Sequence, residues 1–315
     1  MRSTGIYPRL YGRSAKSRSV AYLIPDFQRG VGVMRLTRVK FEGRVRSALV
    51  EDDQLRLLET ENLVSALSLI ASGHDLPVGS RIPRGSAELL APIESESKFF
   101  GIGLNYYSHM AEANLPKPQR PIVFTKYPSV LIGPADDVLL PNTSDMVDWE
   151  AELGVVIGRR LREANVEQAA EAIGGFTVVN DVSARDYQLH ESQWNPGKNV
   201  ESSTPVGPWI VTADELGPNP DLALSTRVDG EVRQHGRTAD QIFTPAQIVS
   251  YISEWITLEP GDIIATGTCA GVGHCMSPAV YLGAGQVLET TIERIGTLTN
   301  RCVSGRVIPI APALT

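Results

Sequence analysis

The sequence predicts an α+β protein in which strands outnumber helices. Its 315 residues include 28 glycines and 21 prolines, and few stretches carry the long 3.6-residue hydrophobic period of a helix. Short apolar or alternating runs that end at turn-forming residues are more common, and they are typical of strands. Between two of these runs stands Asp229–Gly230, a strong signal for a two-residue β-hairpin.

Composition and charge exclude several classes of partner. The chain is 42% hydrophobic and 21% charged, with a formal net charge of −7, which argues against nucleic acid as a partner. It contains no apolar run long enough to span a membrane. Three cysteines without regular spacing predict no disulfide framework. We therefore expect a cytoplasmic protein that binds neither nucleic acid nor membranes.

Residues 1–33 differ from the rest of the chain, because they hold six basic residues and a single acid, Asp26. A basic, acid-poor leader is typical of an organelle transit peptide. The alternative is a disordered extension or an upstream start codon. We favour this alternative because a clear hydrophobic pattern begins at Met34.

A small N-terminal α+β domain is predicted over residues 34–95. Leu36–Phe41 and Val45–Val50 read as two strands around a turn at Glu42–Gly43. A short amphipathic helix follows over Asn62–Ala71 and stops before Gly73.

The stretch KFFGIGLNYYSHMAEANLP, from Lys98, predicts a buried strand, a turn and a helix that bears His109 and Glu112. A spacing of three residues places these two side chains on one helical face. A carboxylate there can orient an imidazole as a general base. The alternative is an exposed polar helix face. The proline-rich exit after this helix, up to Pro121, could act as a lid.

The stretch VDWEAELGVVIG, from Val147 to Gly158, predicts a strand with two different faces. One face is apolar: Ala151, Leu153, Val155 and Ile157. Glu150 and Glu152 share the other face, where two close carboxylates repel unless a cation or a proton relieves them. An all-oxygen pair suits Mg²⁺, Mn²⁺ or Ca²⁺. The alternative is the solvent-facing side of an antiparallel strand.

The next segments add further polar candidates. A helix is predicted over Val166–Ile173, ended by Gly174–Gly175, and it leads to a strand at Phe176–Asn180. Asp181 follows that strand, at a sheet edge where a ligand can bind.

Basic and amide side chains follow Asp181. Arg185 and Gln188 are donors able to face a carboxylate or carbonyl group, although Arg185 could equally pair with a nearby acid in a structural network. Lys198 lies in a loop beside a glycine, so its backbone can approach another group closely.

The last third of the chain predicts more strands and one capped helix. The strands are Trp209–Thr212, Leu222–Val228, Glu231–His235, Val287–Ile292 and Gly296–Cys302, and the helix is Thr244–Glu254. LEPGDIIATGTCAGVG predicts a buried strand and a Gly-rich loop whose amides and Thr268 can point at an anion. No GK[ST] or G-x-S-x-G motif is present. Cys269, His274 and Cys275 have no second cluster at zinc-like spacing, so we predict no zinc site from them.

Taken together, these segments resemble the fumarylacetoacetate hydrolase superfamily over roughly residues 34–303, most strongly from Phe99 to Gly273. The matching stretches are GIGLNYYSHMAE, PIVFTKYPSVLIGP, DWEAELGVVIG, NDVSARDYQ, QWNPGKN, TPVGPW, RVDGEVRQ and LEPGDIIATGTCAGVG. Each is loose alone, whereas the set in this order is specific. Within the superfamily the chain is similar to short bacterial members, the fumarylpyruvate and acylpyruvate hydrolases and the 2-hydroxyhepta-2,4-diene-1,7-dioate isomerases.

The resemblance implies a mixed β-sandwich roll over residues 96–303, with a tail at 304–315. It implies one Mg²⁺ or Mn²⁺ per subunit, no organic cofactor, and a homodimer that acts on a small keto acid. The metal ligands would be Glu150, Glu152 and Asp181. The catalytic residues would be His109, Glu112 and Lys198, and the substrate-binding residues Arg185, Gln188 and Thr268.

This chain also departs from the family pattern near the substrate. Val200–Glu201 stand where the family has Phe-Asp, and Cys269 replaces the usual proline. The stretch GHCMSPAVYLGAG after Val272 differs as well. The metal site is therefore a firmer expectation than the substrate.

We expect a metal-dependent hydrolase that cleaves a C–C bond in a 1,3-dicarbonyl substrate resembling fumarylpyruvate or fumarylacetoacetate, as in aromatic catabolism. His109 and Glu112 would activate water, and the metal and Lys198 would stabilise the enolate. The alternative is a β-keto-acid decarboxylase or an enol–keto isomerase that uses the same site. A third hypothesis, a non-catalytic metal-binding scaffold, is disfavoured by the presence of His109 and Lys198.

Overall fold

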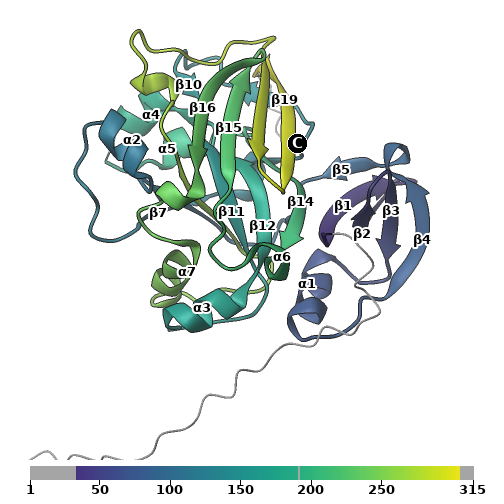
Figure 1. Ribbon diagram of the computed structural model, residues 1–315. Helices are drawn as coiled ribbons and strands as arrows, with labels where there is room; N and C mark the ends of the chain where they lie inside the picture. Colours follow the sequence, from purple (N-terminus) through teal and green to yellow (C-terminus); the bar gives the residue numbers. More distant parts are fainter. Residues whose placement is uncertain (1–32, 191, 306–315) are drawn as a thin grey trace, which may run out of the picture.

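The computed structural model describes residues 33–190 and 192–305 of the chain. Figure 1 shows a smaller lobe that begins near residue 34 and a larger lobe that contains most of the chain. Strands form the centre of both lobes, which confirms the predicted α+β class. Among the described residues, no helix has the length and apolarity needed to cross a membrane. Except for Val33, the predicted extension at residues 1–33 lies outside the described residues, as does the tail beyond Gly305.

The smaller lobe has the predicted hairpin and helix. Glu42 and Gly43 adopt φ values of 49° and 74° in the turn, as a two-residue hairpin requires. Asn62 caps the helix by accepting a hydrogen bond from the amide of Ser65. The elements are β1 (Arg35–Phe41), β2 (Arg44–Glu51), β3 (Gln54–Leu58), α1 (Leu63–Ala71), β4 (Val78–Pro83), a 3₁₀ turn (Arg84–Ser86) and β5 (Glu88–Leu90).

One large sheet runs through both lobes. Its order is β4-β3-β2-β1-β14-β12-β11-β17-β6-β7, so the sheet of the smaller lobe continues into the larger one where β1 pairs with β14. β5 adds to β1, and β8 adds to β14. The strands of the larger lobe are β6 (Phe99–Gly103), β7 (Ile122–Lys126), β8 (Leu131–Ile132), β11 (Ala151–Ile157), β12 (Ile173–Asn180), β14 (Thr204–Thr212) and β17 (Ile263–Thr268).

A second sheet, ordered β16-β15-β18-β19-β9, lies against the large one, and its strands stand in front of β11 and β12 in Figure 1. β15 and β16 form the hairpin predicted at Asp229–Gly230. The strands are β9 (Val138–Leu140), β15 (Ala223–Val228), β16 (Glu231–Arg237), β18 (Val287–Ile292) and β19 (Gly296–Ser304), and a short ribbon joins β10 (Val147–Asp148) to β13 (Ser183–Ala184).

Helices lie at the ends of the sheets. α3 and α7 pack together at one end, and each begins with a capping box, from Asn165 and from Thr244. α2, α4 and α5 gather on the other side of the larger lobe (Figure 1). The helices are α2 (Tyr107–Glu112), α3 (Val166–Ala172), α4 (Arg185–His190), α5 (Asn195–Lys198), α6 (Ala213–Leu216) and α7 (Pro245–Ser253), with 3₁₀ turns at Pro128–Val130, Thr238–Asp240 and Gly273–Cys275.

β11 is a central strand with both faces covered. Its alternate side chains Leu153 and Val155 belong to the core that includes α3 and α7, and Val156 belongs to the core that includes α1. Glu150 and Glu152 are only 5% and 1% exposed. Because both side chains are buried, the solvent-facing alternative for this carboxylate pair is wrong.

Two boundaries in this region differ from the prediction. The single strand predicted from Val147 to Gly158 is split into β10 and β11. The helix α3 ends at Ala172, and Gly174–Gly175 belong to β12 rather than to a helix stop. A Cβ on Gly174 would lie 2.8 Å from the Cα of Gly158. These glycines therefore allow two backbones to approach closely, a long-range need that a local helix-stop rule does not detect.

Candidate active site

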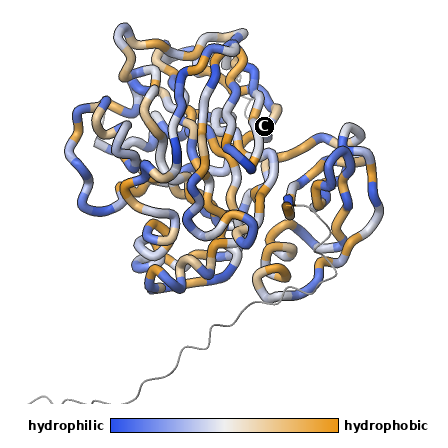
Figure 2. Tube along the Cα trace, in the orientation of Figure 1, coloured by the Kyte–Doolittle hydropathy of each residue, from blue (hydrophilic) through white to orange (hydrophobic). Residues whose placement is uncertain are grey.

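A cavity of about 680 Å³ lies between α2, α4, α5 and the loop after β17. Eight of the nine predicted site residues line it, and the ninth, Asp181, is fully buried behind Lys198. Pro116 and Pro118 from the predicted proline-rich exit also line it. That segment, between α2 and β7, is mostly hydrophilic (Figure 2). The structure thus brings all the predicted residues to one place.

Three carboxylates form the deepest part of this site. Glu150 lies between β10 and β11, Glu152 lies on β11, and Asp181 directly follows β12. Each offers one oxygen within 4.8 Å of those of the other two. β11 and β12 pair so that Ala151 faces Asn180, and the amide of Asp181 donates to the carbonyl of Glu150 at 2.9 Å. Antiparallel pairing of β11 with β12 therefore brings Asp181, some thirty residues later in the chain, next to the Glu-x-Glu pair.

Glu150 is held by two cations. Lys198 Nζ lies 2.6 Å from its Oε2, and Arg185 Nη1 lies 2.6 Å from its Oε1. Burial by itself would raise the pKa of this carboxyl, but the two cations outweigh burial and hold the pKa of Glu150 well below its usual range. Glu150 is therefore ionised at neutral pH.

Glu152, unlike Glu150, has no basic partner among the described residues. Its Oε2 accepts a hydrogen bond of 2.7 Å from the amide of Gly267, but within the described part of the chain no basic side chain forms an ion pair with it. A β-bulge positions this amide. Glu152 and Gly154 are two residues apart on β11, whereas their partners on β17, Thr268 and Ala265, are three residues apart. Burial, then the charges of Asp181 and Glu150, raise the pKa of Glu152 well above its usual range.

Asp181 is bound by two lysines. Lys198 Nζ lies 2.8 Å from its Oδ2, and Lys126 Nζ donates to its Oδ1. Lys126 also donates to the carbonyl of Lys198 at 2.6 Å. Burial lowers the pKa of Lys126, whereas Asp181 and Glu150 outweigh burial and raise the pKa of Lys198. Lys198 is thus the more firmly protonated of the two.

Lys198 is placed by the contact between α5 and α4. A Cβ on its neighbour Gly197 would lie 2.4 Å from the amide nitrogen of Gln188 and 2.5 Å from the carbonyl of Ala184. Only glycine allows this approach, which matches the close approach predicted for this loop. The ammonium also stands 5.2 Å from the ring centroid of Phe124, an additional favourable contact for a buried cation.

Arg185 takes part in the structural network that the sequence left open. Its Nε lies 2.8 Å from Asp148 Oδ2, and its Nη1 contacts both Glu150 and Gln188 Oε1. The neighbouring carboxylates raise the pKa of Arg185 despite its burial. Its Nη2 is buried and has no hydrogen-bond partner among the described residues. Both Arg185 and Gln188 line the cavity.

His109 and Glu112 form the predicted pair on α2. His109 Nδ1 lies 2.7 Å from Glu112 Oε1, and Glu112 Oε2 accepts a hydrogen bond of 2.9 Å from the amide of Gly271. With Glu112 ionised, Nδ1 carries the proton and Nε2 keeps a lone pair. The side chains are 15% and 21% exposed and line a cavity, so the alternative of an exposed polar helix face is wrong.

Thr268 lines the cavity, but its hydroxyl already has two partners. It donates to the carbonyl of Ala151 at 2.8 Å and accepts from Gln234 Nε2 at 2.8 Å. Gln234 also accepts from the amide of Ala151 at 2.9 Å. Thr268 therefore ties β17 to β11 in addition to forming a wall of the cavity.

The carboxylate cluster fits a hard divalent cation. All three donors are oxygens, the ligand type that Mg²⁺ and Mn²⁺ prefer. Glu152 in particular is buried and has no basic side chain as its partner within the described ranges, so a cation would supply the missing countercharge. Glu150, Glu152 and Asp181 would be its ligands.

Sequence reasoning did not single out three residues of this site: Lys126, Asp148 and Gln234. Asp148 accepts from the amides of Gly273 and His274 as well as from Arg185, and thereby fixes the loop after β17. A signal existed for Lys126, because strand alternation in IVFTK places it on the same buried side as Phe124. Asp148 and Gln234 make contacts to distant segments that no local pattern indicates.

Comparison with known proteins agrees with this geometry. Residues 98–303 match the family model described as "Fumarylacetoacetate (FAA) hydrolase C-terminal". A 2,4-didehydro-3-deoxy-L-rhamnonate hydrolase of Sphingomonas sp. (strain SKA58) is 40% identical, over 84% of this chain and 94% of that protein. A mitochondrial oxaloacetate tautomerase of Bos taurus is 38% identical, over 87% of this chain and 85% of the relative.

A solved structure shows the same fold. The crystal structure of 2-hydroxyhepta-2,4-diene-1,7-dioate isomerase from Mycobacterium marinum superposes with a TM-score of 0.73 at 36% sequence identity. The superposition covers 86% of this chain and 98% of the isomerase. The family match spans the cavity, the carboxylate cluster and the His109–Glu112 pair. The chain therefore belongs to the fumarylacetoacetate hydrolase family of enzymes.

Proposed function

We propose that this enzyme hydrolyses a C–C bond in a 1,3-dicarbonyl acid, either an acylpyruvate such as fumarylpyruvate or a fumarylacetoacetate-like diacid. One observation carries the proposal: the His109–Glu112 pair lines the same cavity as Glu150 and Glu152 of the buried carboxylate cluster. A substrate can thus place one end beside the cluster and present its far carbonyl to a general base.

The charge balance of the site favours an anionic substrate. Four buried carboxylates, Asp148, Glu150, Glu152 and Asp181, stand against three buried cations, Lys126, Arg185 and Lys198. The formal sum is −1, and a bound Mg²⁺ or Mn²⁺ would make it +1. One carboxylate of a keto acid would then neutralise the site. Such a cation would act as a Lewis acid that polarises carbonyl and enolate oxygens.

The names of the relatives support the same substrate class. The name 2,4-didehydro-3-deoxy-L-rhamnonate describes a sugar acid oxidised at carbons 2 and 4, hence a 1,3-dicarbonyl acid. That relative matches almost its whole length to this chain and is named a hydrolase.

The side chains have distinct roles in the proposed reaction. His109 Nε2 takes a proton from water while Glu112 holds the ring, and the resulting hydroxide attacks the carbonyl carbon distal to the carboxylate. The C–C bond then breaks, and its electron pair remains on the keto-acid fragment as an enolate. Lys198, protonated and buried, stabilises that negative charge. Protonation of the enolate carbon yields a carboxylic acid and a keto acid.

Arg185 and Gln188 would bind the carboxylate end of the substrate. The side-chain amide nitrogen of Gln188 is one donor on this wall, and the unpaired Nη2 of Arg185, which is buried, would donate after a movement of the side chain. We assign Thr268 to the pocket wall, because its hydroxyl proton is used by the carbonyl of Ala151.

The second candidate is an enol–keto tautomerase or isomerase, or a β-keto-acid decarboxylase. It is favoured by relatives named oxaloacetate tautomerase and 2-hydroxyhepta-2,4-diene-1,7-dioate isomerase. Both reactions need the same stabilised enolate but no attack by water. In that case His109 would move a proton between carbon and oxygen of the substrate.

Product analysis in ¹⁸O-labelled water separates the two candidates. The enzyme is incubated with acylpyruvates, fumarylpyruvate and oxaloacetate, with Mg²⁺ or Mn²⁺. We expect one ¹⁸O atom in the carboxylate of the acid released from the acyl side. That carboxylate is diagnostic because ketone oxygens exchange with water spontaneously. Rapid enol–keto conversion without cleavage or label in any carboxylate would contradict the hydrolase proposal.

We further propose that the protein is a cytoplasmic homodimer. In each subunit, residues 34–95 would form a small domain and residues 96–303 the catalytic domain. The three cysteines are all unpaired, as in a reducing compartment. Light scattering of the purified protein tests the dimer directly.

A further inference from the structure

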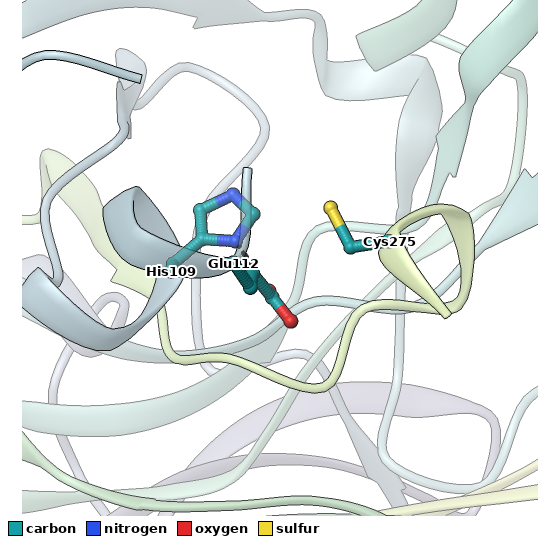
Figure 3. A group of neighbouring side chains, drawn as sticks. All are labelled: His109, Glu112 and Cys275. Carbon is teal, nitrogen blue, oxygen red and sulfur yellow. Dashed lines mark hydrogen bonds and ion pairs between the residues drawn. The ribbon is translucent and has the colours of Figure 1, made fainter. Parts of the chain in front are cut away.

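A second group of metal-ligating side chains lies in the same cavity. His109, Glu112 and Cys275 each offer one ligand atom, and these atoms lie within 4.8 Å of one another. Figure 3 shows the sulfur of Cys275 pointing toward the imidazole ring of His109, with Glu112 beside the ring. All three are partly exposed and line the cavity, so an ion can reach them from solvent.

The donor set differs in kind from the carboxylate cluster. It combines imidazole nitrogen, carboxylate oxygen and thiolate sulfur, which suits Zn²⁺ or Cd²⁺ and not Mg²⁺. Zinc bonds of about 2.0–2.3 Å place tetrahedral ligand atoms roughly 3.3–3.8 Å apart. The three ligand atoms lie within 4.8 Å of one another, so we infer that side-chain rotations would bring them to this spacing. A water molecule from the cavity would complete the fourth position.

Backbone contacts hold the three side chains in place. The 3₁₀ turn that ends at Cys275 is anchored because Asp148 accepts from the amides of Gly273 and His274, at 2.7 and 2.9 Å. Glu112 accepts from the amide of Gly271 at 2.9 Å, which joins α2 to the same loop. These contacts hold the loop that carries Cys275 next to α2, which carries His109 and Glu112.

We propose that His109, Glu112 and Cys275 form a binding site for thiophilic divalent metals, with Zn²⁺ as the natural occupant, and that this site is separate from the carboxylate cluster. Its effect on activity rests on the function proposed above. Coordination through Nε2 removes the lone pair that the general base needs, and coordination through Nδ1 breaks its contact with Glu112. Zinc would therefore inhibit an enzyme that Mg²⁺ supports.

Cobalt reports on this site without any assay of activity. The full chain, saturated with Mg²⁺, is titrated with Co²⁺, and only a thiolate ligand gives an intense near-ultraviolet charge-transfer absorption. We expect this absorption to saturate at one Co²⁺ per chain, to disappear when Zn²⁺ is added, and to be missing in Cys275→Ser. The control His274→Gln alters the neighbouring residue of the same loop and should keep the absorption.

Inhibition is then measured on the same proteins. We expect Cys275→Ser to need at least about tenfold more Zn²⁺ for half-inhibition than the wild type, with His274→Gln remaining sensitive. A cobalt absorption that persists in Cys275→Ser would overturn the proposed site. Zinc binding that depends on Cys275 but leaves turnover unchanged would support the site and contradict the role of His109 as general base.

Discussion

Glu150 and Glu152 lie two residues apart in the chain, yet only Glu150 has basic partners. Lys198 and Arg185 each contact Glu150 at 2.6 Å, whereas the carboxylate of Glu152 accepts only the amide of Gly267 among contacts with the described residues. Two equivalent positions of one sequence motif therefore have opposite electrostatic environments. This asymmetry makes Glu152 the carboxylate that most needs a bound cation.

Replacing each glutamate by glutamine should have different effects on the metal-free protein. Glu150→Gln leaves Lys198 and Arg185 with one carboxylate fewer, so we expect a loss of stability on the order of 3 kcal/mol. Glu152→Gln removes a buried charge that has no countercharge, so we expect little loss or a gain. Urea unfolding in the presence of EDTA measures both. Equal destabilisation of the two variants would refute the asymmetry.

The pKa of Glu152 also predicts how stability depends on pH. Because burial and the charges of Asp181 and Glu150 raise this pKa, the metal-free folded protein holds the proton more tightly than the unfolded chain. The resulting stabilisation is full below the unfolded value of about 4.5 and is lost as pH rises through the folded pKa. We expect the Tm in EDTA to fall more steeply above pH 5 in the wild type than in Glu152→Gln. Parallel pH profiles would argue against a raised pKa.

Removal of the general base should affect chemistry but not metal binding. We expect His109→Ala to lower kcat by about 10²–10⁴-fold, and Glu112→Gln by less, because the imidazole remains present. Calorimetric titration with Mn²⁺ should give unchanged affinity in both variants, since neither residue belongs to the carboxylate cluster. Near-normal kcat in His109→Ala would exclude its proposed role.

A methyl group on Gly197 should displace Lys198. The added Cβ would collide with backbone atoms of Gln188 and Ala184, so α5 must move away from α4. We expect Gly197→Ala to lose roughly 1–3 kcal/mol of stability, measured by urea unfolding. Gly85→Ala is the matched control, because nothing lies within 4 Å of its added Cβ. Similar behaviour of the two variants would show that the close contact is unimportant.

Local sequence patterns predicted much of this molecule. Turn residues located the hairpins at Glu42–Gly43 and Asp229–Gly230, amphipathic spacing located α1, and a capping residue located the start of α7. Strand alternation placed Glu150 and Glu152 on the face opposite Leu153. These features depend on a few neighbouring residues, which is why they could be read from the chain.

Long-range contacts account for what the sequence did not reveal. Lys126 contacts Asp181 from another strand, and Asp148 joins Arg185 to the loop after β17. Gly174 is required by the approach of Gly158, not by a helix end. Cys275 lies beside His109 although 166 positions separate them in the sequence. Spacing rules for zinc sites could not detect the group of His109, Glu112 and Cys275, because these residues come from distant segments of the chain.

We propose that Glu150, Glu152 and Asp181 bind the divalent cation on which turnover depends. Mn²⁺ binding, followed by electron paramagnetic resonance, and turnover should be measured on the same samples of wild type and Glu152→Gln. We expect one Mn²⁺ per wild-type chain, and in the variant an affinity at least about tenfold weaker with a parallel loss of turnover. Stoichiometric Mn²⁺ binding and full metal-dependent turnover in Glu152→Gln would contradict the account.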